Sequence, residues 1–429
     1  MLKGALLAAV VGLTLFAAGG CGGGSDAGPP ATVAATIGTA PQPLPASLER
    51  ELEDVAAIRG LPAPTDVKVS LVAHADVSKL LDSVLTASDR TSFAHTTTLY
   101  RLLGHLRKDE DYESAYLTFA GDSVQGLYSP AAKTLWVVHP DGQNIDWENL
   151  PRDQRSTLAH ELVHAIQDAT FDLDKQAAKS ENDLDGSLAR TCVVEADAVL
   201  NERAYTAKYL ELPGGRVLLA GYTGLANDAP PSIQRELFFP YTACVDWLGT
   251  IRSTQGEGAI DKLIVDAPAS TAEVLHPELA ASGFKPASVT LPDLSGALGS
   301  GWTRESGGTL GEFQLRNYLQ LRVRALDASQ AAAGWAGDRY DVYRRGNESV
   351  AVFRVRFADA GEAQRFVTTQ DALLQAEDAK RAVDAGVTTA QTNDGNTTVR
   401  VAPNGTDVLF AIGTSSDVAQ RAVKVIAGG

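Results

Sequence analysis

The stretch Ser156-Thr-Leu-Ala-His160-Glu161-Leu-Val-His164-Ala-Ile-Gln-Asp168 contains an HExxH pattern, whose spacing is dictated by metal chemistry. On an α-helix, residues four apart share a face, so His160 and His164 can direct two imidazole nitrogens at one zinc ion. Glu161 points about 100° around the helix, where its carboxylate can reach a water beside the ion. The pattern therefore predicts a zinc site on this segment.

The segment around the pattern has the features of a helix. Leu158, Leu162 and Ala165 recur at helical spacing, and no Pro or Gly interrupts residues 156–171. Pro151, just upstream, suits a helix start. The alternative is an accidental HExxH on an ordinary buried helix, which would then need hydrogen-bond partners for three polar side chains.

A second helix, expected at 187–210, contains the candidates for the third ligand. Cys192 and Val199 belong to its apolar stripe, and Glu195 lies between them on the same stripe. A buried carboxylate needs a cation or several donors, and a zinc ion would meet that need. We therefore predict Glu195 as the third ligand, with Glu202, seven residues further on, as its rival.

Four further residues are candidates for supporting roles. Asp168 and Asp197 are expected to hydrogen-bond a ligand histidine, although surface charges on a helix would look the same in the sequence. A zinc hydrolase also needs a donor for the oxyanion of its tetrahedral intermediate, and Tyr241 and His276 are the candidates. His276 precedes Pro277, so it could instead be an ordinary loop residue.

The N-terminus has the composition of an export signal. Residues 1–21 carry one Lys, an apolar run at 5–18 and the ending Ala18-Gly-Gly-Cys21. Cys21 resembles the lipidated cysteine of a bacterial lipobox; the alternative is a plain secretory signal cleaved near Gly20. Residues 22–46 are rich in Gly, Pro, Ala and Thr and are predicted to form a flexible tether.

The overall composition is that of an acidic globular protein. The chain has 429 residues, a formal net charge of −16 and 44% hydrophobic residues, and no stripe of Lys and Arg. Nucleic acid is therefore disfavoured as a partner. Apart from Cys21, the only cysteines are Cys192 and Cys244, which in an exported protein either form a disulfide or remain two buried thiols.

The mature chain is expected to hold two domains. We place the first, a zincin-like metallopeptidase domain with a mainly helical C-terminal half, at 47–284. A β-hairpin at 124–128 and 134–138 leads into the zinc helix and is the candidate strand for pairing with a substrate backbone. The order strand-strand-helix-strand-strand-helix predicts a small α+β module within 285–429, which we interpret as a substrate-positioning or interaction module. The expected fold class is α+β.

Several segments resemble a group of exported bacterial HExxH proteins of gluzincin type, over most of the mature chain. These segments are Gly126-Leu-Tyr128-Ser-Pro130, HELVHAIQD at 160–168, Glu195-Ala-Asp197-Ala198, Phe239-Pro-Tyr241, His276-Pro277 and Ala333-Gly-Trp335-Ala-Gly-Asp338-Arg339-Tyr340. The resemblance implies zinc on His160, His164 and Glu195, with Glu161 as the general base. The group usually has Gly where this chain has Ala196 and Cys244.

These features together predict a membrane-tethered, extracytoplasmic zinc metalloendopeptidase. It would cleave peptide or protein substrates with a water activated by zinc, and Glu161 would carry the proton to the leaving amine. The first alternative is a non-catalytic zinc lipoprotein that binds a partner in the cell envelope. The second is a metallohydrolase acting on another bond, such as a peptide crosslink of the cell wall.

Overall fold

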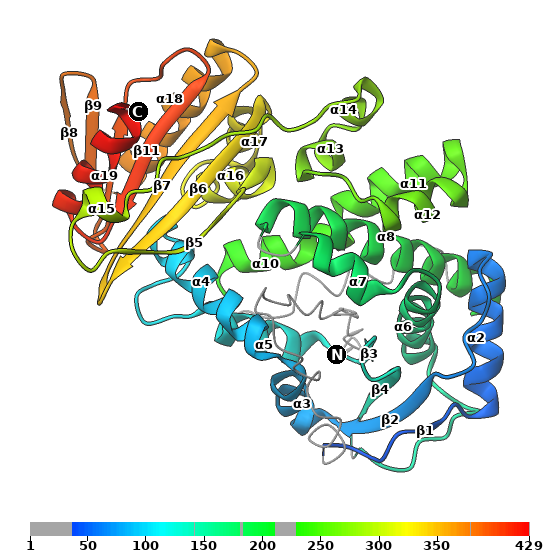
Figure 1. The fold of residues 1–429 in the computed structure, drawn as a ribbon. Coiled ribbons are helices and arrows are strands. Elements are labelled where there is room, and N and C mark those ends of the chain that lie inside the picture. Colours follow the sequence, from blue (N-terminus) through cyan, green and yellow to red (C-terminus); the bar gives the residue numbers. More distant parts are fainter. Residues whose placement is uncertain (1–36, 141, 181–182, 211–228, 378, 429) are drawn as a thin grey trace, which may run out of the picture.

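The computed structural model describes residues 37–428 except 141, 181–182, 211–228 and 378 (Figure 1). It combines helices with two separate β-sheets, which confirms the α+β class. The predicted signal peptide at 1–21, with its candidate lipidation site Cys21, lies outside the described residues. Most of the tether predicted at 22–46 also lies outside them.

The first sheet has the strand order β1-β2-β4-β3. Its strands are β1 (Gln42–Pro43), β2 (Lys68–Ala73), β3 (Gly126–Ser129) and β4 (Thr134–His139). The β2–β4 pair is parallel and the two outer pairs are antiparallel. β3 and β4 are the hairpin that the sequence predicted, and within the described residues β3 lies at the edge of the sheet.

The last part of the predicted tether is folded. Gln42 pairs with Val69, and the Thr39 backbone N–H donates to the carbonyl of Leu71 over 2.8 Å. Residues 39–43 of the predicted tether are therefore attached to the first sheet. This short polar segment has no hydrophobic period of its own, but the open edge of β2 offers it backbone hydrogen bonds.

Helices cover this sheet and continue beyond it. Those up to residue 209 are α2 (Ala46–Arg59), η1 (His74–Asp76), α3 (Val77–Val84), α4 (Ala87–Leu103), α5 (Tyr112–Ser123), α6 (Arg152–Phe171), α7 (Leu173–Ala177), η2 (Ala178–Ser180) and α8 (Leu184–Tyr209). The following ones are α10 (Pro231–Phe238), η3 (Phe239–Tyr241), α11 (Ala243–Gln255), α12 (Glu257–Val265), α13 (Thr271–Leu275) and α14 (Pro277–Ser282).

The helix that carries HExxH packs between the first sheet and α8. Leu158 and Leu162 of α6 are buried with Leu52 of α2 and Leu135 of β4 in one hydrophobic cluster. α6 starts after Pro151, as predicted, and α2 is capped at its C-terminus by Gly60, whose φ of 76° is the left-handed conformation that glycine adopts without strain. Apolar contact on one face and a polar face toward α8 set the orientation of α6.

The second sheet is antiparallel, with the order β5-β6-β7-β11-β10-β9-β8. Its strands are β5 (Thr303–Gly308), β6 (Trp335–Arg345), β7 (Glu348–Phe357), β8 (Lys380–Asp384), β9 (Val387–Gln391), β10 (Thr397–Val401) and β11 (Asp407–Gly413). The helices around it are α15 (Ser295–Leu298), α16 (Gly311–Leu319), α17 (Ala325–Ala332), α18 (Ala360–Ala376) and α19 (Ser416–Gly428).

This sheet is larger than the sequence predicted, because β5, β8 and β9 extend its two edges. All residues of β8 are exposed, and β5 is a polar, Gly-containing segment. Neither therefore has the apolar alternation by which a half-buried strand is recognised.

The two parts of the chain are joined by buried contacts. In β7, Val350 and Val352 face the cluster that contains α19, whereas Phe353 belongs to the cluster that contains Leu99 and Leu102 of α4. The sheet at the upper left of Figure 1 therefore packs against the helices of the first part.

Candidate metal centre

His160 and His164 of α6 meet Glu195 of α8 at the buried contact between the two helices. The two Nε2 atoms are 3.1 Å apart, and Glu195 Oε2 lies 3.3 Å from His160 Nε2 and 3.4 Å from His164 Nε2. All three side chains are buried. The three residues form a group of the kind that can hold a metal ion.

These distances fit a zinc ion. Ligand atoms at ordinary zinc distances in a tetrahedral site are about 3.3 Å from one another. Two facing imidazole nitrogens also need a proton or a cation between them, because each presents a lone pair when unprotonated. The donor set of two imidazoles and one carboxylate is one that zinc accepts.

The electrostatics of the site favour a positive charge. Burial by itself lowers the pKa of His160, but the neighbouring carboxylates of Glu195 and Glu202 raise it to about 10. Burial likewise acts to raise the pKa of Glu195, but the two histidines hold it well below its usual range. A cation among the three side chains would satisfy the same attraction.

The outer nitrogen of His164 is held by an amide. Its Nδ1 lies 2.8 Å from Gln167 Oε1, which fits donation from Nδ1–H and leaves the Nε2 lone pair for a metal. Gln167 Nε2 donates to Asp197 Oδ2 over 2.9 Å, and Arg59 Nε donates to the same oxygen over 2.9 Å. Asp197 was predicted to bond a ligand histidine, and the structure connects it to His164 through Gln167.

The outer nitrogen of His160 faces Glu202. Glu202 Oε2 lies 3.3 Å from His160 Nδ1, and Ser156 Oγ donates to the other carboxylate oxygen. Glu202 was the rival third ligand, but the structure places it behind the imidazole ring, opposite the nitrogen that faces Glu195. There it can fix the orientation of the ring.

Glu161 lies beside β3. Its Oε2 accepts a 2.8 Å hydrogen bond from the Tyr128 backbone N–H, and burial raises the pKa of its carboxyl group. The other oxygen, Oε1, is buried and has no hydrogen-bond partner among the described residues. A Cβ on Gly126 would lie only 3.1 Å from Glu161 Cγ, so glycine lets the strand approach this closely.

Asp168 does not reach a ligand histidine. It accepts hydrogen bonds from the Tyr128 hydroxyl over 2.9 Å and from the Leu173 backbone N–H, and it pairs with Lys133. The predicted role of Asp168 is therefore replaced by a structural one. The reason is that its side of α6 faces the β3–β4 hairpin.

The two oxyanion candidates lie in different surroundings. The Tyr241 ring in η3 is 6.3 Å from the His160 ring, and Tyr241 lines a cavity together with Glu195. His276 lies between α13 and α14, where its Nε2 is 2.9 Å from Glu312 Oε1 of α16. The structure brings Tyr241 to the metal residues, whereas His276 pairs with the C-terminal part.

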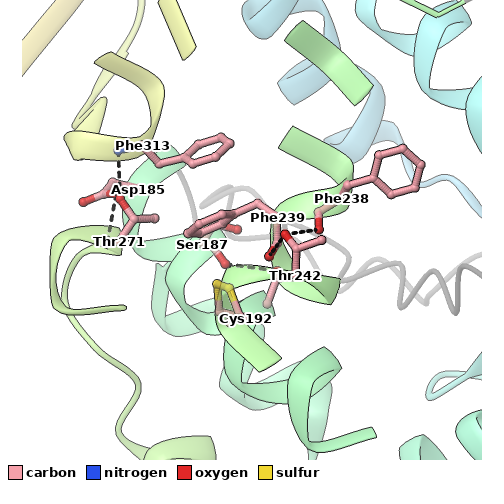
Figure 2. The surroundings of a disulfide bond; sticks show 10 residues. Asp185, Ser187, Cys192, Phe238, Phe239, Thr242, Thr271 and Phe313 are labelled. Atoms are coloured by element: carbon pink, nitrogen blue, oxygen red, sulfur yellow. Dashed lines mark hydrogen bonds between the residues drawn. A yellow bond between two sulfur atoms is a disulfide. The ribbon is translucent and has the colours of Figure 1, made fainter. Parts of the chain in front are cut away.

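Cys192 and Cys244 form a disulfide, so of the two alternatives that the sequence left open the structure has the bond. It joins α8 to the start of α11, close to Phe239 and Thr242 (Figure 2). Beside the disulfide, the Thr242 hydroxyl donates to the carbonyls of Phe238 and Phe239. The bond thereby ties the helix of Glu195 to the turn of Tyr241.

Sequence reasoning missed three parts of the site. Gln167 stands three residues after His164, a spacing that brings side chains together on a helix, so the signal was present. Arg59 and the Tyr128 backbone N–H come from α2 and β3, and their positions have no local signature.

One family model matches part of the chain. It is described as a domain of unknown function (DUF8575) and covers residues 301–423, beyond the His–His–Glu group. No curated protein and no solved structure gives a significant match. Among the described residues, no helix is both long and apolar enough to cross a membrane.

Proposed function

We propose that the protein is a zinc metallopeptidase of the HExxH, gluzincin type, built on a zincin-like domain. The observation that carries the proposal is the convergence of His160 Nε2, His164 Nε2 and Glu195 Oε2 at mutual distances of 3.1, 3.3 and 3.4 Å. Three protein ligands are the number that catalytic zinc sites use, since a fourth position must stay open to water or substrate.

His160, His164 and Glu195 would hold the ion, and a bound zinc would supply Lewis acidity toward a water molecule and the substrate carbonyl. Glu161 acts as the base. Its free Oε1 can accept a proton from the attacking water, and burial, which raises the pKa of the carboxyl group, helps it to hold that proton until the leaving amine takes it. Tyr241, beside His160, is the candidate hydrogen-bond donor to the oxyanion.

The edge strand β3 supports a peptide as the substrate. It runs past Glu161, with Gly126 and Tyr128 in contact with or bonded to that side chain. An extended peptide could add to this edge by main-chain hydrogen bonds, which recognise a backbone whatever its side chains. Such pairing would bring a peptide bond to Glu161.

The test measures metal content and cleavage together. The chain, purified without chelators and supplied with zinc, should bind one equivalent and cleave members of a mixed peptide library. Glu161→Gln should keep the zinc and lose the cleavage, because the amide cannot take a proton. Glu53→Gln, at an exposed position on α2, is the matched control and should behave like the parent chain.

Two results would contradict the proposal. A chain that binds zinc but cleaves no peptide would point to a non-catalytic zinc protein or to a hydrolase of another bond. A chain that binds no zinc would remove the metal centre itself.

We also propose that the protein is exported and anchored as a lipoprotein through Cys21. The support is the sequence of residues 1–21 alone. In a bacterial host, a labelled fatty acid should enter the parent chain, which should sediment with membranes. Cys21→Ala should abolish both; unchanged membrane sedimentation without label would contradict lipid anchoring.

A further inference from the structure

A cavity of about 250 Å³ lies beside the metal residues, between α4, α5, α8 and the α10–η3 segment. Glu195 and Tyr241 line it on the side of the candidate metal centre. Its other walls include Phe93, Leu188 and Leu237. We call it the α8–α10 cavity.

The acidic side chains along this cavity are already engaged. Glu195 meets the histidines, and Asp89 accepts from the Thr86 backbone N–H at the start of α4 over 2.7 Å. Glu236 accepts from the Tyr112 hydroxyl over 2.8 Å and from Gln314 Nε2 over 3.0 Å.

Tyr100 is a third donor to Glu236, and burial raises the pKa of the Glu236 carboxyl group. With its polar atoms paired in this way, Glu236 does not need a cation from a ligand. The surface left to an incoming group is therefore mainly apolar, and three acids with no Lys or Arg in the lining disfavour an acidic group.

The size of the cavity matches a single side chain. Pockets that enclose whole small-molecule ligands usually measure about 300–1,000 Å³. The Phe93 and Tyr116 rings, whose centroids are 5.2 Å apart, give one wall an aromatic surface. Aromatic walls pack well against another large apolar or aromatic group.

We propose that the α8–α10 cavity receives one large apolar side chain of the substrate, next to the bond that is cleaved. This inference rests on the proposed peptidase function and specifies its substrates. Because Gln314 lies on α16, inside the region matched by the family of unknown function, that region takes part by holding Glu236 in the inner wall.

The experiment compares cleavage profiles of the zinc-loaded full chain and of Leu188→Phe. Leu188 lines the cavity but is none of the proposed metal or proton-transfer residues. The parent should prefer Phe, Leu or Met over Ala by about tenfold or more in kcat/KM at one position flanking the cut. Leu188→Phe should move the preference at that position toward small residues and leave other positions unchanged. Leu326→Phe, at a side chain that is 65% exposed, is the control for an added aromatic ring.

A second measurement avoids catalysis. Phenylpropionohydroxamate and acetohydroxamate share a metal-binding group and differ in the apolar tail. Calorimetry on zinc-loaded Glu161→Gln protein should give at least about tenfold tighter binding of the phenyl compound, and adding Leu188→Phe should remove most of that difference.

The outcomes separate this inference from the proposed function. A preference for Lys or Arg would mean that Glu236 binds a cation, and would overturn the inference while leaving the peptidase standing. A flat profile, or one unaffected by Leu188→Phe, would also overturn it. Zinc binding without cleavage, together with the expected hydroxamate difference, would keep the apolar cavity and overturn the peptidase.

Discussion

At the scale of single residues, both histidines of the candidate metal group have a polar side chain next to Nδ1, on the side away from Glu195. Glu202 faces His160 Nδ1, and Gln167 faces His164 Nδ1. Partners at Nδ1 keep each Nε2 lone pair directed at the position where the three ligand atoms meet. A histidine pair without these partners would have to pay rotamer entropy on binding a metal.

Glu202→Gln should therefore weaken zinc binding without removing it. The substitution keeps the shape of the side chain but loses the charge behind His160, so we expect an affinity lower by about tenfold to a hundredfold. Competition with a chelating dye measures this affinity, and Glu53→Gln again serves as the control. An unchanged affinity would mean that Glu202 only fills space beside Ser156.

At the scale of elements, the site depends on how α8 is held relative to η3 and α11. Cys192 stands one turn before Glu195, and Cys244 stands three residues after Tyr241. The disulfide therefore links the helix of the candidate ligand Glu195 to the turn of the candidate oxyanion donor Tyr241. Near the disulfide, the Phe239 ring packs at a tilt against Phe313 of α16, with ring centroids 4.3 Å apart (Figure 2).

Replacing both cysteines by alanine should lower the stability of the fold. The cysteines are 52 residues apart, and in the chain-entropy model a loop of that length corresponds to about 4 kcal/mol. Thermal unfolding with and without dithiothreitol measures the effect. The reductant should lower the Tm of the parent and leave that of the double variant unchanged; equal Tm values for all samples would contradict a stabilising disulfide.

At the scale of the whole molecule, two buried acids, Asp185 and Asp338, lie where the first part of the chain meets the second. Asp338 in β6 accepts from the Leu310 and Gly311 backbone N–H groups over 2.9 Å, and Asp185 at the start of α8 accepts from the Thr271 backbone N–H over 3.0 Å. Gly311 has a φ of 73°, and a Cβ there would overlap the Asp185 carboxylate. The hydrogen bonds that Asp338 accepts from Leu310 and Gly311 give this residue of the 333–340 segment a structural role.

The buried Asp185 carboxyl group should make the free energy of unfolding depend on pH. Burial raises the pKa of Asp185 from the ordinary value for an aspartate, about 3.9, to about 8, although bonds from Ser270 and Thr271 act to lower it. Between these values the folded chain keeps a proton that the unfolded chain has lost, so the Asp185 contribution to stability falls as the pH rises from about 4 to about 8.

Urea unfolding at about pH 5 and about pH 8.5 tests this effect of the raised pKa. The parent should lose more stability between the two values than Asp185→Asn, which keeps one oxygen acceptor and does not titrate. Asp384→Asn, at an exposed position in β8, should match the parent. Equal pH dependence in the parent and Asp185→Asn would contradict the proposed titration.

Local periodicity carried much of the prediction, and its limits appear at particular residues. Helical spacing placed His160 and His164 on one face of α6 and put Glu195 among buried apolar side chains of α8, where the structure has it. The same reasoning failed for Asp168, which is buried as required but faces the hairpin. Helical periodicity predicts that one face of a helix is buried, but it does not predict which element packs against that face.

The sequence by itself determined the three residues of the candidate metal group and the helices that carry them, because the spacing of a helix is a property of the local backbone. Only the tertiary structure decided that Glu202 stands behind His160, that the Tyr128 N–H holds Glu161, and that α4, α5, α8, α10 and η3 together line the α8–α10 cavity. Contacts of this kind join segments far apart in the chain, and they arise from the packing of whole elements, for which no short stretch of sequence has a pattern.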